Sequence, residues 1–274
     1  MIDRDLVKRA LAEDLQGGED ITSVATVSGT EKVVADFVAR KGGVIAGIDM
    51  ARAVLDEVGL TDIALLVQDG ATVKAGTVLM TVRGDTRAIL LAERTALNFL
   101  GHLSGIATLT HTWVDAIAGT SCQIRDTRKT TPGMRLLEKY AVRMGGGTNH
   151  RMSLSDAALI KDNHIVAAGG VAQAFSQVRA KYPTADIEIE VDTLDQLTEV
   201  LPLKPDLVLL DNMSPAQCAE AVSLVAGSTK LEASGGISLE NAKTYAATGV
   251  NYLAIGALTH SAPVLDIGLD LRAE

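Results

Sequence analysis

Two short motifs bring cationic side chains together in the sequence, and their residue types suit the binding of anions. Residues 126–129 read Asp-Thr-Arg-Lys, residues 149–151 read Asn-His-Arg, and Lys161 follows in the apolar context ALIKDNHI. Residues 87–164 hold ten Lys and Arg against six Asp and Glu, a net charge of +4, whereas the whole chain carries −9, so the remainder sums to −13. A local excess of cations within an acidic protein predicts a pocket for a small polyanion.

The composition argues against several classes of function. Aromatic residues make up 3% of the chain, and no broad basic face is apparent, so we expect no nucleic-acid partner. The N-terminus lacks the apolar core of a signal peptide, and no apolar run approaches the ~18 residues that span a bilayer. Cys122 and Cys218 have neither metal-ligand spacing nor the pattern of a disulfide framework. We therefore expect a cytoplasmic protein without a membrane segment, in which both cysteines are buried fillers.

The first third of the chain combines helical and strand-like patterns. Residues 1–15 are typical of an amphipathic helix, and residues 33–82 of short strands punctuated by glycine. Residues 70–85, which overlap the end of that region, are typical of a segment rich in hairpins. Residues 86–116 predict a helix that breaks near Gly101–Gly105.

From residue 122 onward, strand-like runs alternate with helical stretches. The polar or glycine ends of four runs lie at Glu190, Asp211, Ser234 and Gly256, at intervals of 21, 23 and 22 residues. This step fits one strand, one helix and two loops, repeated, and predicts a parallel α/β sheet or barrel. Ligands of such folds bind at the C-terminal ends of the strands.

The strand at 186–192 carries two carboxylates on one face. Its apolar residues alternate with Glu188 and Glu190, so the glutamates should point away from the outer helices and into a barrel. A carboxylate inside a barrel is costly unless it is paired or binds a cation.

The cationic residues of the two motifs form one candidate anion-binding set. Arg presents a planar fork that suits carboxylates, whereas Lys is a movable point charge. Surface charge or structural ion pairs are the alternative for each residue alone, and for the histidine a satisfied structural role. The set consists of Arg128, Lys129, His150, Arg151 and Lys161.

The strand ends offer a candidate cation site and a candidate phosphate site. Glu190 and Asp211 could hold Mg²⁺ or the hydroxyls of a phosphorylated ligand, or could instead be buried carboxylates that pair with Lys or Arg. The glycines of residues 234–236 and of Gly256-Ala257 would let backbone N–H groups approach a phosphate, although a plain turn is the alternative. His260 could cap the phosphate end.

Taken together, these motifs resemble the quinolinate phosphoribosyltransferase family over nearly the whole chain. The most specific are DTRKTTPG, GGGTNHR and IKDNH, all within residues 126–164. Further matches are AEDLQGGEDITS, RKGGVIAGI, ERTALNFLGHLSGIAT, IEVD, LLDNMS, EASGGIS and AIGALTHS. A molybdenum-associated protein of the same fold shares DTRKTTPG, but it is not expected to carry NHR followed by IKDNH.

The resemblance implies a reaction between two strongly anionic substrates. The ring nitrogen of quinolinate attacks C1 of 5-phosphoribosyl-1-pyrophosphate, Mg-bound pyrophosphate leaves, and loss of CO₂ gives nicotinate mononucleotide, as in NAD biosynthesis. The quaternised ring nitrogen withdraws electrons, so no organic cofactor is required. Carboxylates can stabilise the oxocarbenium-like transition state.

The resemblance also implies roles for individual residues. Arg94, Arg128, Arg151 and Lys161 would hold the quinolinate carboxylates beside His150, and Lys129 would contact the donor. Thr127 and Ile255 would be further substrate-binding residues. Glu190 and Asp211 would serve the ribose and Mg²⁺, directly or through water. The phosphate end would comprise Ser234, Gly235, Gly236, Gly256, Ala257 and His260. The catalytic residues would be Lys129, Lys161, Glu190 and Asp211.

The same resemblance implies an α/β fold with two domains. An N-terminal α/β sandwich would span residues 1–108, and an open, TIM-like α/β barrel would span 109–261. The tail, 262–274, could return to the first domain. The family further implies a homodimer in which Arg94, on the apolar stripe of its helix, enters the neighbouring subunit's acceptor site.

Two other functions remain open from the sequence. A related phosphoribosyltransferase could act on nicotinate or another small carboxylate, and the number of cations would distinguish it because a dicarboxylate needs more than one Arg clamp. A non-catalytic protein could bind the phosphoribosyl donor without releasing pyrophosphate.

Overall fold

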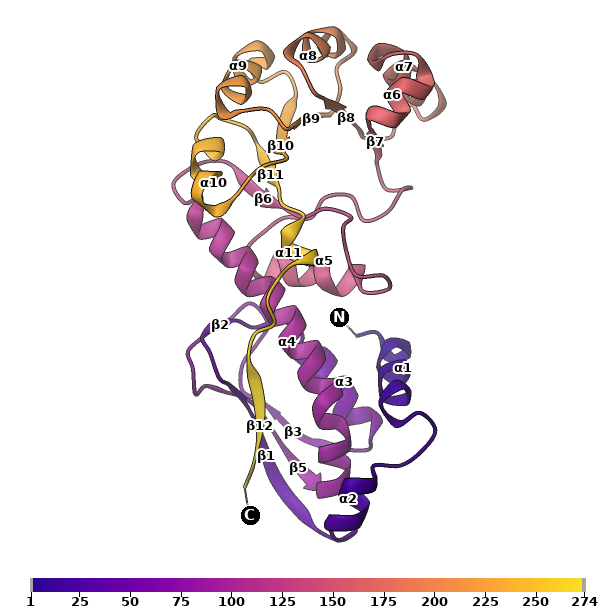
Figure 1. Cartoon of the computed structure of the whole chain (residues 1–274), viewed down its shortest axis with the longest axis vertical. Coiled ribbons are helices and arrows are strands. Elements are labelled where there is room, and N and C mark those ends of the chain that lie inside the picture. The colour runs from indigo at the N-terminus through magenta and orange to yellow at the C-terminus, as the bar shows by residue number, and fades with distance from the viewer. Residues whose placement is uncertain (1, 273–274) are drawn as a thin grey trace. The chain divides into compact units, whose positions relative to one another are not determined.

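The computed structural model describes residues 2–272, which form two compact units (Figure 1). Of the described residues, the first unit contains 2–111, 136–146 and 261–272, and the second contains 112–135 and 147–260. Among the described residues, none of the helices is both long and apolar enough to cross a membrane.

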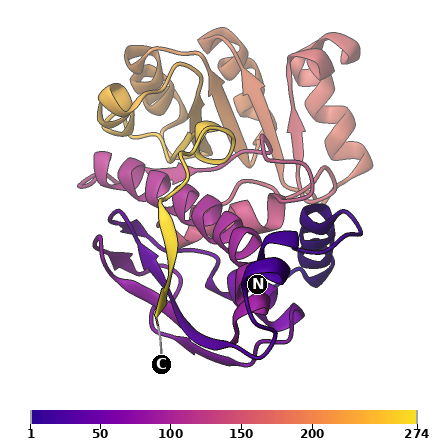
Figure 2. The same cartoon turned by 60° about the horizontal axis from the view of Figure 1, so that its bottom comes forward.

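The first unit is built on a four-stranded antiparallel sheet in the order β12-β1-β5-β3. Strand β1 (Lys32–Ala39) pairs on one side with β12 (Ile267–Arg272) and on the other with β5 (Val78–Asp85), which also pairs with β3 (Asp62–Leu65). The last described strand, β12, thus lies beside the first, β1 (Figure 2).

Five helices complete this unit. They are α1 (Arg4–Leu15), α2 (Ile21–Thr26), α3 (Ile48–Glu57), α4 (Thr86–Ala116) and α5 (Arg135–Met144), of which the last residues of α4 and the first of α5 belong to the second unit. The expected helix within residues 1–15 is confirmed, because α1 buries Val7 and Leu11 on one face.

The hairpins expected at residues 70–85 are wrong in their pairing. Strand β4 (Thr72–Val73) pairs with β2 (Gly43–Val44) rather than with β5. The apolar strand β5 takes a central place between β1 and β3 because most of its side chains are buried, which an edge hairpin would leave half exposed.

The break expected in the long helix is also wrong, since α4 is continuous over 31 residues. A Cβ atom at Gly101 would lie 2.9 Å from Val264 Cγ1, and one at Gly105 would meet the carbonyl of Pro263. Glycine in a helix interior costs ~1 kcal/mol relative to alanine. Here it lets the C-terminal segment pack directly against the helix, and that contact offsets the cost.

The second unit is an open α/β barrel built on six parallel strands in the order β6-β11-β10-β9-β8-β7. The strands are β6 (Gln123–Arg125), β7 (Ala158–Ile160), β8 (Ile187–Val191), β9 (Leu207–Asp211), β10 (Lys230–Ser234) and β11 (Tyr252–Ala254). The strand-like runs expected from residue 122 onward are thus confirmed. The barrel is open because β6 and β7 are edge strands that do not pair with each other.

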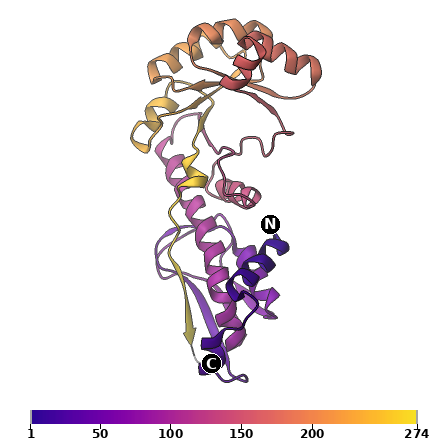
Figure 3. The ribbon, with the colours of Figure 1, turned by 45° about the vertical axis from the view of Figure 1, so that its right-hand side comes forward.

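Helices follow the strands, and most of these helices lie on one side of this sheet (Figures 1 and 3). They are α6 (Asp162–Ala168), α7 (Val171–Lys181), α8 (Leu194–Val200) with the short η1 (Leu201–Leu203), α9 (Pro215–Val225), α10 (Leu239–Ala246) and α11 (Ala257–His260). Every residue of β8 is buried, including Glu188 and Glu190. Because Ile187, Ile189 and Val191 take the alternate positions of the strand, the two glutamates share the other face.

Candidate active site

A cavity of about 750 Å³ lies in the second unit, among residues at the C-terminal ends of the parallel strands. It gathers all but one of the side chains and glycines that the sequence singled out for substrates. They are Thr127, Arg128, Lys129, His150, Arg151, Lys161, Glu190, Asp211, Ser234, Gly235, Gly236, Ile255, Gly256, Ala257 and His260. The exception is Arg94, which belongs to α4 of the first unit and is exposed.

The cavity also has lining residues that the sequence analysis missed. Four of them are apolar, whereas Asp162, Asn212 and Glu232 carry polar groups. Asn212 and Glu232 lie within the motifs LLDNMS and EASGGIS, so their position beside known candidates was the available signal.

Two guanidinium groups face the cavity from different segments. Arg128 follows β6, and its Nε atom is buried without a hydrogen-bond partner among the described residues. Arg151 donates from Nη1 to the carbonyl of Ala157 at 2.8 Å. Burial lowers the pKa of Arg151, and the positive charge of Arg128 lowers it further. Two like charges held together in this way favour the arrival of an anion.

A lysine and a glutamate meet at the ends of neighbouring strands. Lys161 precedes α6, and its Nζ lies 3.2 Å from Oε2 of Glu190. Burial raises the pKa of the Glu190 carboxyl, whereas the charge of Lys161 acts in the opposite direction. Lys161 is therefore both an anion-binding candidate and the ion-pair partner of Glu190.

Asp211 ends β9 close enough to interact with these groups. Burial and the charge of Asp192 raise the pKa of Asp211, while Lys161 and Lys129 lower it. The Asn212 side chain donates to Asp211 Oδ2 at 2.6 Å from a left-handed backbone (φ 54°). The charge of Asp211 also raises the pKa of the Glu190 carboxyl, so a cation bound near both groups would favour their ionised forms.

The glycines expected at the phosphate end have two different roles. Gly235 and Gly236 adopt left-handed conformations (φ 86° and 65°), and a Cβ at Gly235 would collide with the Asn212 side chain. A Cβ at Gly256 would instead lie 3.1 Å from Lys129 Cδ and 3.2 Å from His260 Nε2. The missing side chain at Gly256 therefore leaves room where these two basic groups converge.

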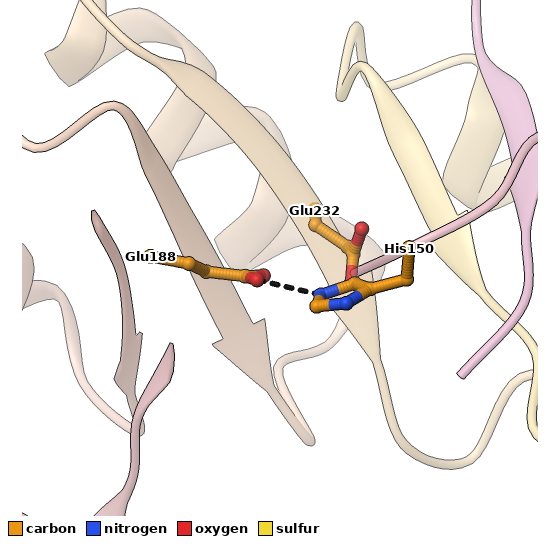
Figure 4. Close-up of side chains that lie close together, drawn as sticks. All are labelled: His150, Glu188 and Glu232. Atoms are coloured by element: carbon orange, nitrogen blue, oxygen red, sulfur yellow. Dashed lines mark hydrogen bonds and ion pairs between the residues drawn. The ribbon is translucent and has the colours of Figure 1, made fainter. Parts of the chain in front are cut away.

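His150 is held by hydrogen bonds within the protein (Figure 4). Its Nδ1 accepts from the backbone N–H of Arg151 at 2.7 Å, and its Nε2 lies 2.6 Å from Oε2 of Glu188. Because Nδ1 accepts a hydrogen bond, the ring proton is assigned to Nε2, which donates a hydrogen bond to Glu188. A carboxylate inside the barrel was expected either to be paired or to bind a cation, and Glu188 is paired with His150.

One group of three potential metal ligands occurs among the described residues, and it is not the expected one. It consists of His150, Glu188 and Glu232, whose ligand atoms lie within 4.8 Å of one another. Glu190 and Asp211 supply only two carboxylates, which suits a Mg²⁺ ion whose other ligands come from a substrate.

Comparison with known proteins gives a consistent result. Residues 20–104 match the family described as quinolinate phosphoribosyl transferase, N-terminal domain, and residues 106–270 match the corresponding C-terminal domain. The carboxylating nicotinate-nucleotide pyrophosphorylase of Mycobacterium leprae is 54% identical over 274 residues, which cover 98% of this chain and 96% of that protein. A probable enzyme of the same name from Bacillus subtilis is 40% identical, covering 98% and 93%.

Solved structures agree with the sequence relatives. The nicotinate-nucleotide pyrophosphorylase of Francisella tularensis superposes with a TM-score of 0.95 at 38% identity, covering 99% of this chain and 98% of that one. The corresponding structure from Ehrlichia chaffeensis gives a TM-score of 0.94 at 38% identity, covering 98% of each chain.

Proposed function

Because the chain belongs to the quinolinate phosphoribosyltransferase family, we propose that it transfers the phosphoribosyl group of 5-phosphoribosyl-1-pyrophosphate to quinolinate. The ring nitrogen of quinolinate forms the new bond to C1 of the ribose as the bond to pyrophosphate breaks. The carboxylate next to the ring nitrogen then leaves as CO₂, and the electron pair left on the ring carbon takes a proton. The products are nicotinate mononucleotide, pyrophosphate and CO₂.

The observation that carries this proposal is the pair of guanidinium groups in one cavity. The charge of Arg128 helps to lower the pKa of Arg151, and Arg128 Nε is buried without a hydrogen-bond partner among the described residues. Quinolinate offers two carboxylates, which match two planar forks with Lys161 nearby. A monocarboxylate such as nicotinate would leave one of these cations uncompensated, so the arrangement favours a dicarboxylate acceptor.

The opposite part of the cavity suits the phosphorylated donor. Lys129 and His260 converge above Gly256, and the Thr259 hydroxyl donates to the Lys129 carbonyl at 2.7 Å, which fixes this segment. Backbone N–H groups around Gly235 and Gly236 would donate hydrogen bonds to the donor's 5′-phosphate. We assign Lys129 to the donor's charged groups and the glycines to close backbone contact.

Glu190 and Asp211 would bind the donor's hydroxyls and its Mg²⁺ ion. Their pKa values are raised chiefly by burial, so a neighbouring cation would stabilise their ionised forms. A bound Mg²⁺ would neutralise the pyrophosphate leaving group. The two carboxylates themselves would stabilise positive charge that develops on the ribose ring in the transition state.

We further propose that the active unit is a homodimer. Arg94 is exposed on α4 in the single chain, although it follows Leu90 and precedes Leu97 on a largely apolar helix. Exposure removes the cost of burying this charge alone, and it leaves the guanidinium accessible to a second copy. Arg94 would then complete the neighbouring subunit's acceptor site, because it does not line its own chain's cavity.

Turnover of defined substrates tests the proposal. Purified protein is incubated with quinolinate, the donor and Mg²⁺, and nicotinate mononucleotide is quantified by chromatography. Replacing quinolinate with nicotinate tests whether the protein is instead a related transferase that acts on a monocarboxylate. Omitting the acceptor measures hydrolysis of the donor in the absence of transfer. A protein that binds the donor but releases no pyrophosphate with either acceptor would be a non-catalytic binding protein, contrary to the proposal.

A further inference from the structure

Two segments of the second unit carry the guanidinium groups of the candidate acceptor site, and they run side by side. The first segment, residues 126–130, follows β6, and the second, residues 148–152, lies beside the end of that strand. Arg125 and Thr148 form a parallel bridge, and the backbone N–H of Asp126 donates to the Thr148 carbonyl at 3.1 Å. The second segment therefore starts in register with the end of β6.

Asp126 makes the first side-chain link between the two segments. Its side chain is fully buried, its Oδ1 accepts from the backbone N–H of His150 at 2.8 Å, and its Oδ2 accepts from the Asn149 side-chain amide. A buried carboxylate is costly unless hydrogen bonds stabilise it. These donors belong to the two residues that lead into Arg151, so the link fixes the start of its segment two residues before Arg128 in the other.

Arg135 makes a second link, beyond the guanidinium-bearing residue of each segment. Its Nε donates to the Thr130 hydroxyl at 3.0 Å, and its Nη1 donates to the Met152 carbonyl at 3.1 Å. The Thr130 N–H in turn donates to the Arg128 carbonyl at 3.0 Å, so this link reaches Arg128 through one tight turn. The planar guanidinium of Arg135 presents its N–H groups to both segments at once, in a fixed geometry.

The spacing of the two cavity guanidinium groups needs such links because like charges do not hold each other in place. Arg128 and Arg151 both line the cavity and are both positively charged, so the surrounding structure must fix the distance between them. Asp126 and Arg135 do not line the cavity. Any effect that they have on a ligand must therefore act through the segments that they join.

We propose that Asp126 and Arg135 are positioning residues, which fix the spacing of the Arg128 and Arg151 guanidinium groups by linking their two segments on both sides. This inference deepens the proposed function and rests on it, because the dicarboxylate acceptor is the ligand for which the spacing matters. Two carboxylates on one ring lie at a fixed distance. A rigid pair of guanidinium groups binds them with a smaller loss of side-chain freedom than a mobile pair.

Steady-state kinetics separates this role from a direct electrostatic one. Arg135→Met should raise the quinolinate KM roughly tenfold and the donor KM by less than about threefold, because misplaced charged groups weaken the acceptor site. Lys129, the candidate donor contact, is held separately by the hydroxyl of Thr259. Arg135→Lys should resemble Arg135→Met, since lysine keeps the positive charge but not the fork.

Arg179→Met is the matched control. Arg179 also joins separate segments, because it donates to the Ala185 carbonyl at 2.9 Å and to Asp206 Oδ2 at 2.8 Å. Those partners precede β8 and β9, at the opposite ends of the strands from the cavity. Arg179→Met should therefore keep both KM values at the wild-type level, whatever it does to stability.

A double-mutant cycle tests whether Arg135 acts through the guanidinium pair. Quinolinate affinity is measured by calorimetry in Arg135→Met, in Arg128→Met and in the double variant. In the Arg128→Met background, Arg135→Met should weaken affinity about threefold rather than about tenfold, because only Arg151 remains to be misplaced. Fully additive losses would show that Arg135 acts independently of Arg128 and would overturn the positioning role.

Hydrogen–deuterium exchange of the ligand-free protein tests the links without any substrate. Asp126→Asn keeps the shape of the side chain but only one of its two acceptor oxygens. It should speed the exchange of backbone N–H groups in residues 148–157, and so should Arg135→Met, whereas residues 207–211 of β9 should exchange as in the wild type. Arg135 is half-buried, so Arg135→Met decides the point even if the fully buried Asp126 tolerates no change.

The outcomes separate this inference from the proposed function. Wild-type exchange in folded Arg135→Met, an unchanged quinolinate KM in that variant, or full recovery of the KM in Arg135→Lys would each overturn the inference. Failure of the wild-type protein to bind quinolinate would instead count against the proposed function. The exchange rates would still decide whether Asp126 and Arg135 hold the two segments together.

Discussion

Replacing Arg128 with methionine should weaken quinolinate binding without destabilising the protein. Methionine keeps most of the side chain's length and apolar contacts but removes the guanidinium. In the ligand-free protein that group has a buried Nε without a partner and stands beside the like charge of Arg151. Its removal should leave the free energy of unfolding unchanged or raise it by up to ~1 kcal/mol.

The loss in affinity follows from what the acceptor carboxylate would lack. A hydrogen bond to a charged group contributes ~1.5–3 kcal/mol, and truncating one side of a buried charged pair costs ~2–5 kcal/mol. Arg151 and Lys161 remain in the cavity and compensate in part, which favours the lower end of the range. We expect a loss of ~2–3 kcal/mol, or about 30- to 150-fold in Kd.

Isothermal titration with quinolinate measures this loss, and thermal unfolding of the ligand-free variant measures stability. Arg52→Met on α3, where the side chain is half exposed, controls for general loss of a positive charge. Arg128→Lys should give an intermediate affinity because it keeps the charge but not the fork. An unchanged Kd in folded Arg128→Met would refute the assignment of this residue to the acceptor.

Three further predictions concern the rest of the site. Arg151→Ala should leave folding intact and weaken quinolinate binding by ~2–4 kcal/mol, as measured by titration. Asp211→Asn should lower kcat far more than quinolinate affinity, and activity should require a divalent metal, as steady-state kinetics with and without a chelator would show. Mixing inactive Arg94→Ala and Lys161→Ala subunits should restore roughly a quarter of wild-type sites, because half of the random dimers are mixed and each has one intact site.

Each of these predictions has a contrary result. Wild-type quinolinate affinity in folded Arg151→Ala would remove that residue from the acceptor site. Full activity in the presence of chelator and donor would exclude the Mg²⁺ role. No recovery of activity after verified subunit exchange would show that Arg94 serves its own chain.

The strands of the second unit were predictable because their signal is local. The Glu188 and Glu190 positions alternate with apolar residues, and this period of two defines both the strand and its inward face. Regular spacing of polar strand ends then predicted that Glu190, Asp211 and Ser234 would meet at one edge of the sheet, which the cavity confirms.

The features that the sequence analysis missed depend on contacts distant in the chain. Gly101 and Gly105 indicate a helix break locally, but their role depends on Pro263 and its neighbours. Similarly, nothing near Glu232 reveals that Arg125 and His150 face it from other segments. Periodicity predicts which way a side chain points, whereas its partner is determined by the tertiary fold.

The most direct test of the central claim is the release of CO₂ from quinolinate labelled at the carboxylate next to the ring nitrogen. The purified protein, supplied with the donor and Mg²⁺, should release one labelled CO₂ for each pyrophosphate and form unlabelled nicotinate mononucleotide. Pyrophosphate release without labelled CO₂, or turnover of nicotinate at the same rate as quinolinate, would contradict a decarboxylating transfer to a dicarboxylate acceptor.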